Sequence, residues 1–86
     1  MKVQGAVVKE QGVTFAVVVV KRHAIGNQAS ARQAAASIAP LFPGLPLVLM
    51  SQDSRGVPTY LGRQDIVNFL ASVPMEAIPW KEYTFG

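Results

Sequence analysis

The sequence predicts a small α/β protein of the α+β type, a β-β-α-β-β-α two-layer sandwich with a four-stranded mixed sheet and an aromatic C-terminal tail. Three observations support this prediction. Half of the 86 residues are apolar and only 15% are charged, a balance that favours a folded chain over a disordered one. Valine-rich runs alternate with two segments of helical spacing. The length suits one core, so residues 1–86 are expected to form a single domain, with 1–73 as its core.

A β-hairpin is expected at the start of the chain. Residues 3–9 are rich in valine, Gly12 supplies a turn, and residues 13–22 return as a second strand that contains four consecutive valines. Branching at Cβ disfavours a helix there. Both faces of this second strand are apolar, so we expect it in the middle of the sheet, covered on both sides.

Residues 28–39 are expected to form a helix, because they are rich in alanine, the best helix former. Two residues compete for its N-cap: Asn27, or Ser30 with Gln33 completing a capping box. The small residues of its apolar stripe would allow a close approach to a sheet. The proline-rich segment 40–46 ends the helix.

The second half repeats the pattern of two strands and a helix. Residues 47–51 are a continuous apolar run, typical of a buried strand, and residues 57–61 return as an edge strand because Pro58 lacks an amide donor. Residues 63–73 carry apolar side chains at helical spacing. The tail 74–86 is expected to be either a docked arm or a short edge strand.

The connection through the first helix is long enough to make strands 13–22 and 47–51 parallel and adjacent. Since both strands are apolar on both faces, something has to cover the second face of the sheet. Three arrangements could cover it: helices on opposite faces, the aromatic tail, or a second copy of the chain. The sequence favours the second copy, and hence a homodimer, because exposed apolar patches promote association.

The basic residues suggest an anion site. The formal net charge is +3, and the excess lies in the first half of the chain: residues 1–45 carry +4 and residues 46–86 carry −1. Loops that follow parallel strands meet at one edge of a sheet, where ligands often bind near helix N-termini. No glycine-rich phosphate motif is present, so solvated loop charges are the competing interpretation. The candidate anion-binding residues are Lys21, Arg22, His23, Asn27, Arg55 and Arg63.

Three further features bear on possible chemistry. His23 is the only histidine and, with Asp53, is a candidate for a general base oriented by a carboxylate. Cysteine is absent and no metal-ligand spacing is present, so no metal, cofactor or catalytic set is predicted. The candidate interaction residues of the tail are Trp80, Tyr83 and Phe85, which would pin the tail, line a dimer interface or stack on single-stranded nucleic acid.

The leading prediction is a small non-enzymatic protein-interaction module that self-associates or binds another protein. The alternative is nucleic-acid or other anion binding through the basic loop 21–32, and the third is a small enzyme that uses His23 with Asp53. The longest apolar run, residues 13–20, is far shorter than the roughly 20 residues of a membrane helix. Charges on both sides of this run argue against a secretion signal, so a cytoplasmic location away from membranes is expected.

Overall fold

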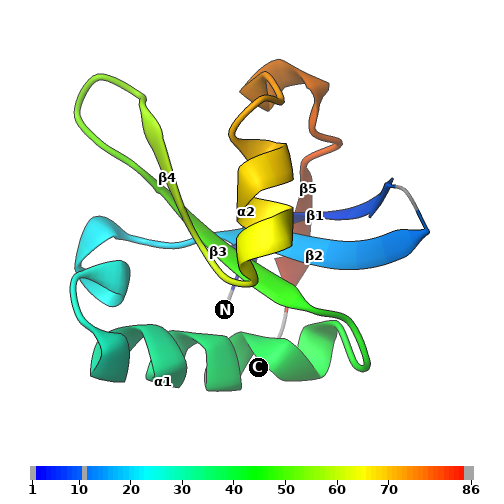
Figure 1. Ribbon diagram of the computed structural model, residues 1–86. Helices are drawn as coiled ribbons and strands as arrows, with labels where there is room; N and C mark the ends of the chain where they lie inside the picture. Colours follow the sequence, from blue (N-terminus) through cyan, green and yellow to red (C-terminus); the bar gives the residue numbers. More distant parts are fainter. Residues whose placement is uncertain (1, 11, 85–86) are drawn as a thin grey trace.

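The computed structural model describes residues 2–10 and 12–84, which form one mixed sheet with a helix on each face (Figure 1). This confirms a small α+β fold with a mixed sheet. Short 3-10 helices, η1 (Arg22–Ile25), η2 (Ala39–Leu41) and η3 (Met75–Ala77), join the main elements. The main elements are β1 (Lys2–Glu10), β2 (Val13–Val19), α1 (Gln28–Ile38), β3 (Leu47–Gln52), β4 (Pro58–Leu61), α2 (Gln64–Leu70) and β5 (Lys81–Thr84).

The sheet has the strand order β4-β3-β2-β1-β5. As expected, β2 and β3 are parallel neighbours, with Val17 opposite Val48, and they occupy the interior of the sheet. β4 lies at one edge, in agreement with the role expected for Pro58. The remaining neighbours, β1 with β2, β3 with β4 and β1 with β5, are antiparallel.

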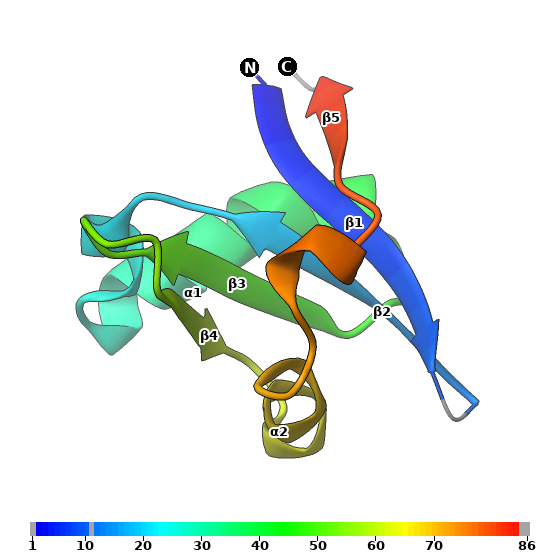
Figure 2. The same ribbon diagram turned by 90° about the horizontal axis from the view of Figure 1, so that it is seen from above.

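The expectation of four strands is wrong, because the tail supplies a fifth. β5 pairs with β1, so that Val3 lies opposite Tyr83 and the first and last strands run side by side (Figure 2). A strand of four residues that begins with two charged side chains has no clear period of apolar residues. Its partner is also far away in the sequence, so local patterns do not reveal the pairing.

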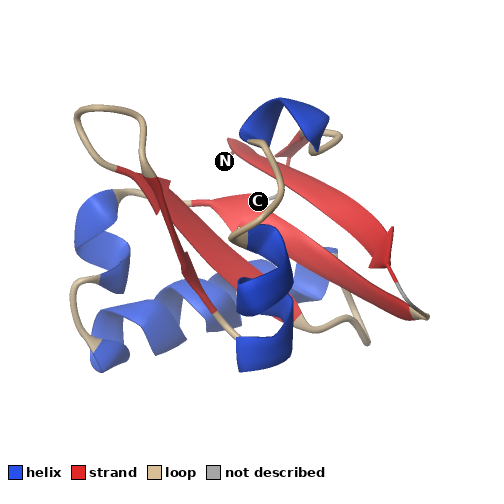
Figure 3. Cartoon of the chain, turned by 45° about the horizontal axis from the view of Figure 1, so that its top comes forward, coloured by secondary structure: helices blue, strands red, loops and turns tan. Residues whose placement is uncertain are grey.

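The two-layer arrangement is also wrong, because the helices lie on opposite faces of the sheet and make three layers (Figure 3). Strand residues alternate between the two faces. On one side Phe15, Val17, Val48 and Met50 pack with Ile66 and Leu70 of α2. On the other side Ala16, Val18 and Leu49 pack with Ala31 and Ile38 of α1 and with Phe42. Of the three arrangements that the sequence allowed for covering the second face, the structure has helices on opposite faces.

Local contacts set the ends of the elements. Asn27 is the N-cap of α1, since its Oδ1 accepts the backbone N–H of Ser30 at 2.9 Å. α1 then passes into η2, which contains Pro40. β2 ends at Val19 rather than at residue 22 because the chain turns into η1, and α2 spans Gln64–Leu70 rather than 63–73.

Candidate anion-binding pocket

The loop after β2 and the turn after β3 lie at the same edge of the sheet, because these strands are parallel. The backbone N–H of Val20 donates to the Met50 carbonyl oxygen at 2.8 Å and holds the two strand ends together. Lys21, His23 and Arg55 are therefore on one side of the molecule, as expected. Arg63 is not, since it follows β4, which runs back to the opposite end of β3.

Lys21 and His23 line a pocket of about 520 Å³ between α1 and the ends of β1 and β2. β2 and β1 cross over α1 in this part of the molecule (Figure 2). Lys2 is the third basic side chain of the lining, and none of the described lining residues is acidic. The rest of the lining is Val3, Val19, Val20, Ala24, Ala34, Ser37 and Ile38.

The pocket exists because α1 presents small side chains to the sheet. Ala31 and Ile38 are buried, whereas Ala34 is only half-buried, as are Val19 and Val20 across the gap. An alanine fills too little of the space that separates a helix from a sheet. The alanine-rich stripe predicts a close approach of the helix to the sheet. The same small side chains leave a hollow beside residues 34–38 of α1.

Lys2 is the pocket residue that the sequence prediction missed. Its ammonium lies 3.7 Å from Glu82 of β5, and both side chains are exposed. Lys2 comes close to Lys21 only through the antiparallel pairing of β1 with β2, in which Gly5 is opposite Val18. The register of the hairpin is the signal from which this neighbour could have been predicted.

The other predicted anion-binding residues at this end of the sheet either stabilise local structure or lie outside the pocket. Arg22 is exposed in η1 and does not line it. The Asn27 side chain is engaged in the cap of α1. Arg55 lies in the exposed β3–β4 turn. The pocket thus keeps two of the six predicted residues, Lys21 and His23.

Asp53 stabilises the β3–β4 turn. Its Oδ1 accepts the backbone N–H groups of Arg55 at 2.8 Å and of Val57 at 3.0 Å. Among the bonds found in residues 2–10 and 12–84, none joins Asp53 to His23. The pair therefore lacks in this structure the contact by which a carboxylate orients a general base.

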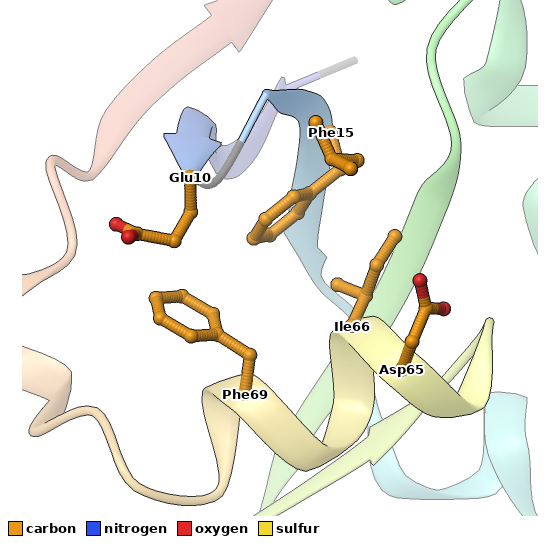
Figure 4. Close-up of a pocket in the computed structure, with 6 residues that line it drawn as sticks. Glu10, Phe15, Asp65, Ile66 and Phe69 are labelled. Carbon is orange, nitrogen blue, oxygen red and sulfur yellow. The ribbon is translucent and has the colours of Figure 1, made fainter.

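A second, smaller hollow of about 120 Å³ lies between the β1–β2 hairpin and α2 (Figure 4). Phe15 and Phe69 meet there edge to face, with ring centroids 6.3 Å apart. The carboxylates of Glu10 and Asp65 point to opposite sides of these rings in Figure 4. Two carboxylates that diverge in this way do not act on one bond of a shared substrate.

Asp65 is instead held by Arg63. The guanidinium Nη2 lies 2.6 Å from Oδ2 and Nε lies 3.0 Å from Oδ1, a bidentate pair. The hydrogen bonds from Arg63 lower the pKa of Asp65, and those to Asp65 raise the pKa of Arg63. The charge of Arg63, the residue before α2, is therefore paired with a carboxylate in the first turn of this helix.

The tail aromatics that the structure describes contact the domain. Trp80 Nε1 donates to the Met75 carbonyl oxygen at 3.1 Å, and Tyr83 packs edge to face on Phe42 with ring centroids 5.0 Å apart. Phe85 lies outside the described residues. Around β5 a shallow hollow is lined by Val7, Pro79, Trp80, Lys81 and Tyr83.

Within the described part of the chain, no three His, Asp or Glu side chains gather where they could hold a metal ion. None of the helices formed by these residues is long and apolar enough to cross a membrane. Comparison of the chain with protein-family models, with curated proteins and with solved structures found no match.

Proposed function

We propose that the chain is a small non-enzymatic binding domain that holds an anionic ligand in the pocket between α1 and the ends of β1 and β2. One observation carries this proposal: Lys2, Lys21 and His23 converge on a hollow of about 520 Å³. Ligand sites commonly enclose roughly 300 to 1,000 Å³ and combine an apolar lining with a few polar groups. The pocket has this size and this composition.

The basic side chains define the charge of the ligand. Lysine ammonium groups and the imidazole N–H of histidine are hydrogen-bond donors, and a bond from an ammonium to an anion is among the stronger ones in proteins. No side chain of the described lining is acidic, and Glu82 of β5, which is not a lining residue, pairs with Lys2 alone. Because the rim is exposed to water, the attraction is expected to weaken as salt is added.

Nucleic acid has less support than a small anion. A nucleic-acid surface needs basic residues along a continuous path, often with aromatic rings on which bases stack. Arg63 is at the far end of β3 and is paired with Asp65, and Trp80 is engaged with the Met75 carbonyl. The observations therefore favour a ligand that fits within one pocket.

A titration with inorganic phosphate at low salt tests the proposal. Amide signals of residues 19–24 and 34–38 in the isotope-labelled protein should shift, and Lys21→Ala should weaken the shifts. Lys9→Ala is the matched control, since Lys9 is an exposed lysine of β1 that does not line the pocket. Equal effects of the two variants, or shifts spread over the whole surface, would contradict an anion site here.

Self-association is a second candidate function, which a different observation supports. Since α1 and α2 cover both faces of the sheet, an uncovered face no longer argues for a dimer. β5, however, leaves an outer edge of the sheet open, and Val7 beside it is 42% exposed. An unpaired edge strand offers backbone groups to another strand. We propose this edge as the surface for a second copy or a protein partner.

Sedimentation at high micromolar concentration tests this second candidate. The wild-type chain should form dimers, and Val7→Lys should shift them towards monomers. Val57→Lys is the control, because Val57 is 54% exposed but lies in the turn before the opposite edge strand, β4. A wild-type monomer under these conditions removes the candidate. A cytoplasmic location stays a prediction from the charges around residues 13–20.

A further inference from the structure

We infer that the ligand of the pocket between α1 and the ends of β1 and β2 is an amphipathic anion, a single alkyl chain that ends in a carboxylate. This inference rests on the proposed function and names the chemical class of its ligand. The carboxylate lies at Lys2, Lys21 and His23, and the alkyl chain lies between α1 and the strands.

The apolar part of the pocket carries the argument. Most of its lining residues are aliphatic. Val3, Val19 and Val20 are half-buried and Ala34 is half-buried opposite them, so each still exposes apolar surface towards the pocket. Every methylene group of a ligand that leaves water for such surface tightens binding by roughly fourfold. An alkyl chain uses this part of the site, whereas a small inorganic anion does not.

The basic residues alone are too exposed for tight binding. Lys21 and His23 are solvent-exposed, and Lys2 is shared with Glu82 at 3.7 Å. Exposed charges are screened by water and salt, so they orient an anion more than they hold it. The site therefore needs the alkyl chain for affinity and the carboxylate for orientation.

Lining residues of the pocket come from different elements. Lys21 and His23 belong to the loop and the η1 turn after β2, whereas Ala34 and Ile38 belong to the inner face of α1. A linear ligand whose carboxylate meets the basic residues can extend its chain along α1. This combination of basic and aliphatic lining residues suits a molecule with one charged end.

The closing experiment compares sodium decanoate with acetate, decanol and inorganic phosphate by the amide signals of the full chain. Decanoate should bind about a hundredfold or more tightly than acetate or phosphate, because burial of about four of its methylene groups, at roughly fourfold each, already gives that factor. Decanol should bind about two- to fivefold more weakly than decanoate, because it lacks the charge that the exposed Lys21 recognises. Lys21→Ala should reduce decanoate affinity by a similar factor, and Lys9→Ala should not.

Filling the pocket gives an independent readout. Ala34→Leu places a larger side chain between α1 and the strands and should reduce decanoate affinity about tenfold. Ala36→Leu is the control, because Ala36 is exposed on α1 and does not line the pocket. Ser37→Leu, at an exposed position of the lining, keeps the test valid if Ala34→Leu does not fold.

The outcomes separate the two proposals. If phosphate, acetate and decanoate bind equally and all depend on Lys21, the alkyl chain is not recognised and this inference fails while the anion site stands. If no anion shifts the signals of residues 19–24 and 34–38, both fail. If the decanoate affinity is unchanged in Lys21→Ala and in the pocket-filling variants, the binding is nonspecific and the inference is also overturned.

Discussion

Gly62 lies directly against Val48: a Cβ atom at position 62 would come within 2.9 Å of Val48 Cγ2 and 3.1 Å of the Leu47 carbonyl oxygen. Val48 is fully buried in the middle of the sheet. Gly62 lies between β4 and α2, where the chain leaves the edge strand. The close approach to Val48 at this point allows α2 to pack over the sheet. A side chain there would force Val48 Cγ2 to move and would press on the β3 backbone at Leu47 and Val48.

Gly62→Ala should therefore destabilise the fold. Overpacking of a tight site typically lowers the free energy of unfolding by about 1 to 3 kcal/mol, and here part of the obstacle is backbone. Gly26→Ala is the matched control, since Gly26 has φ −70° and its nearest contact is His23 O at 3.5 Å. Urea denaturation should show the control unchanged or slightly more stable. Equal losses in both variants would mean that the contact with Val48 is not the cause.

The cap of α1 gives a second pair of variants. Asn27→Ala removes the acceptor at 2.9 Å from the Ser30 amide and should lower the free energy of unfolding by about 1 kcal/mol. Ser30→Ala should cost much less, because α1 begins after Asn27 and Ser30 lies within its first turn. Thermal unfolding followed by circular dichroism measures both. A larger loss for Ser30→Ala would assign the cap to the capping box instead.

The central strands are predictable from the sequence because their signal is local. Valine runs indicate buried strands, and the helix between them requires a parallel pair. β5 and the sides on which the helices lie depend on contacts distant in the sequence, such as Val3 with Tyr83, which no local pattern contains. The three-layer arrangement therefore emerges only in the structure.

The candidate site is predictable to the same extent. Lys21 and His23 follow a strand whose carboxyl end is predictable, and the structure places both at one pocket. Lys2 lies near Lys21 because β1 pairs with β2. Arg63 lies far from this pocket because β4 runs back along β3. The hollow itself depends on how α1 packs its alanines against the sheet, which is a property of the assembled layers.

Tyr60 carries a hydroxyl group that is buried without a hydrogen-bond partner in the described part of the chain. Burial raises the pKa of Tyr60, because the charged phenolate is disfavoured away from water. Tyr60→Phe removes an unpaired polar group and should raise the free energy of unfolding by about 1 kcal/mol near neutral pH. A loss of similar size in urea denaturation would show that the hydroxyl has a partner.

The same residue sets an alkaline pH dependence. A tyrosine whose pKa is raised by folding contributes its full stability below the unfolded value of about 10 and loses it as the pH rises through the folded value. Wild-type protein should therefore lose stability above about pH 10 faster than Tyr60→Phe. Parallel losses in the two proteins would contradict a buried hydroxyl.

Asp65 sets an acid pH dependence through its bidentate pair with Arg63. Because folding lowers the pKa of this carboxyl group, the pair contributes stability above the ordinary carboxyl range of about 4 and loses it as the pH falls through the lower folded value. Asp65→Asn should therefore differ most from wild type in its free energy of unfolding at neutral pH, and the difference should shrink below about pH 4.

The side chains of Arg63 and Asp65 are both exposed, so this difference in stability should be small and should fall with added salt. Urea denaturation of the two proteins across this range measures it, with Glu76→Gln as a control at an exposed carboxyl group that is not paired with Arg63. An offset that stays constant into acid would show that the pair with Arg63 does not stabilise the fold.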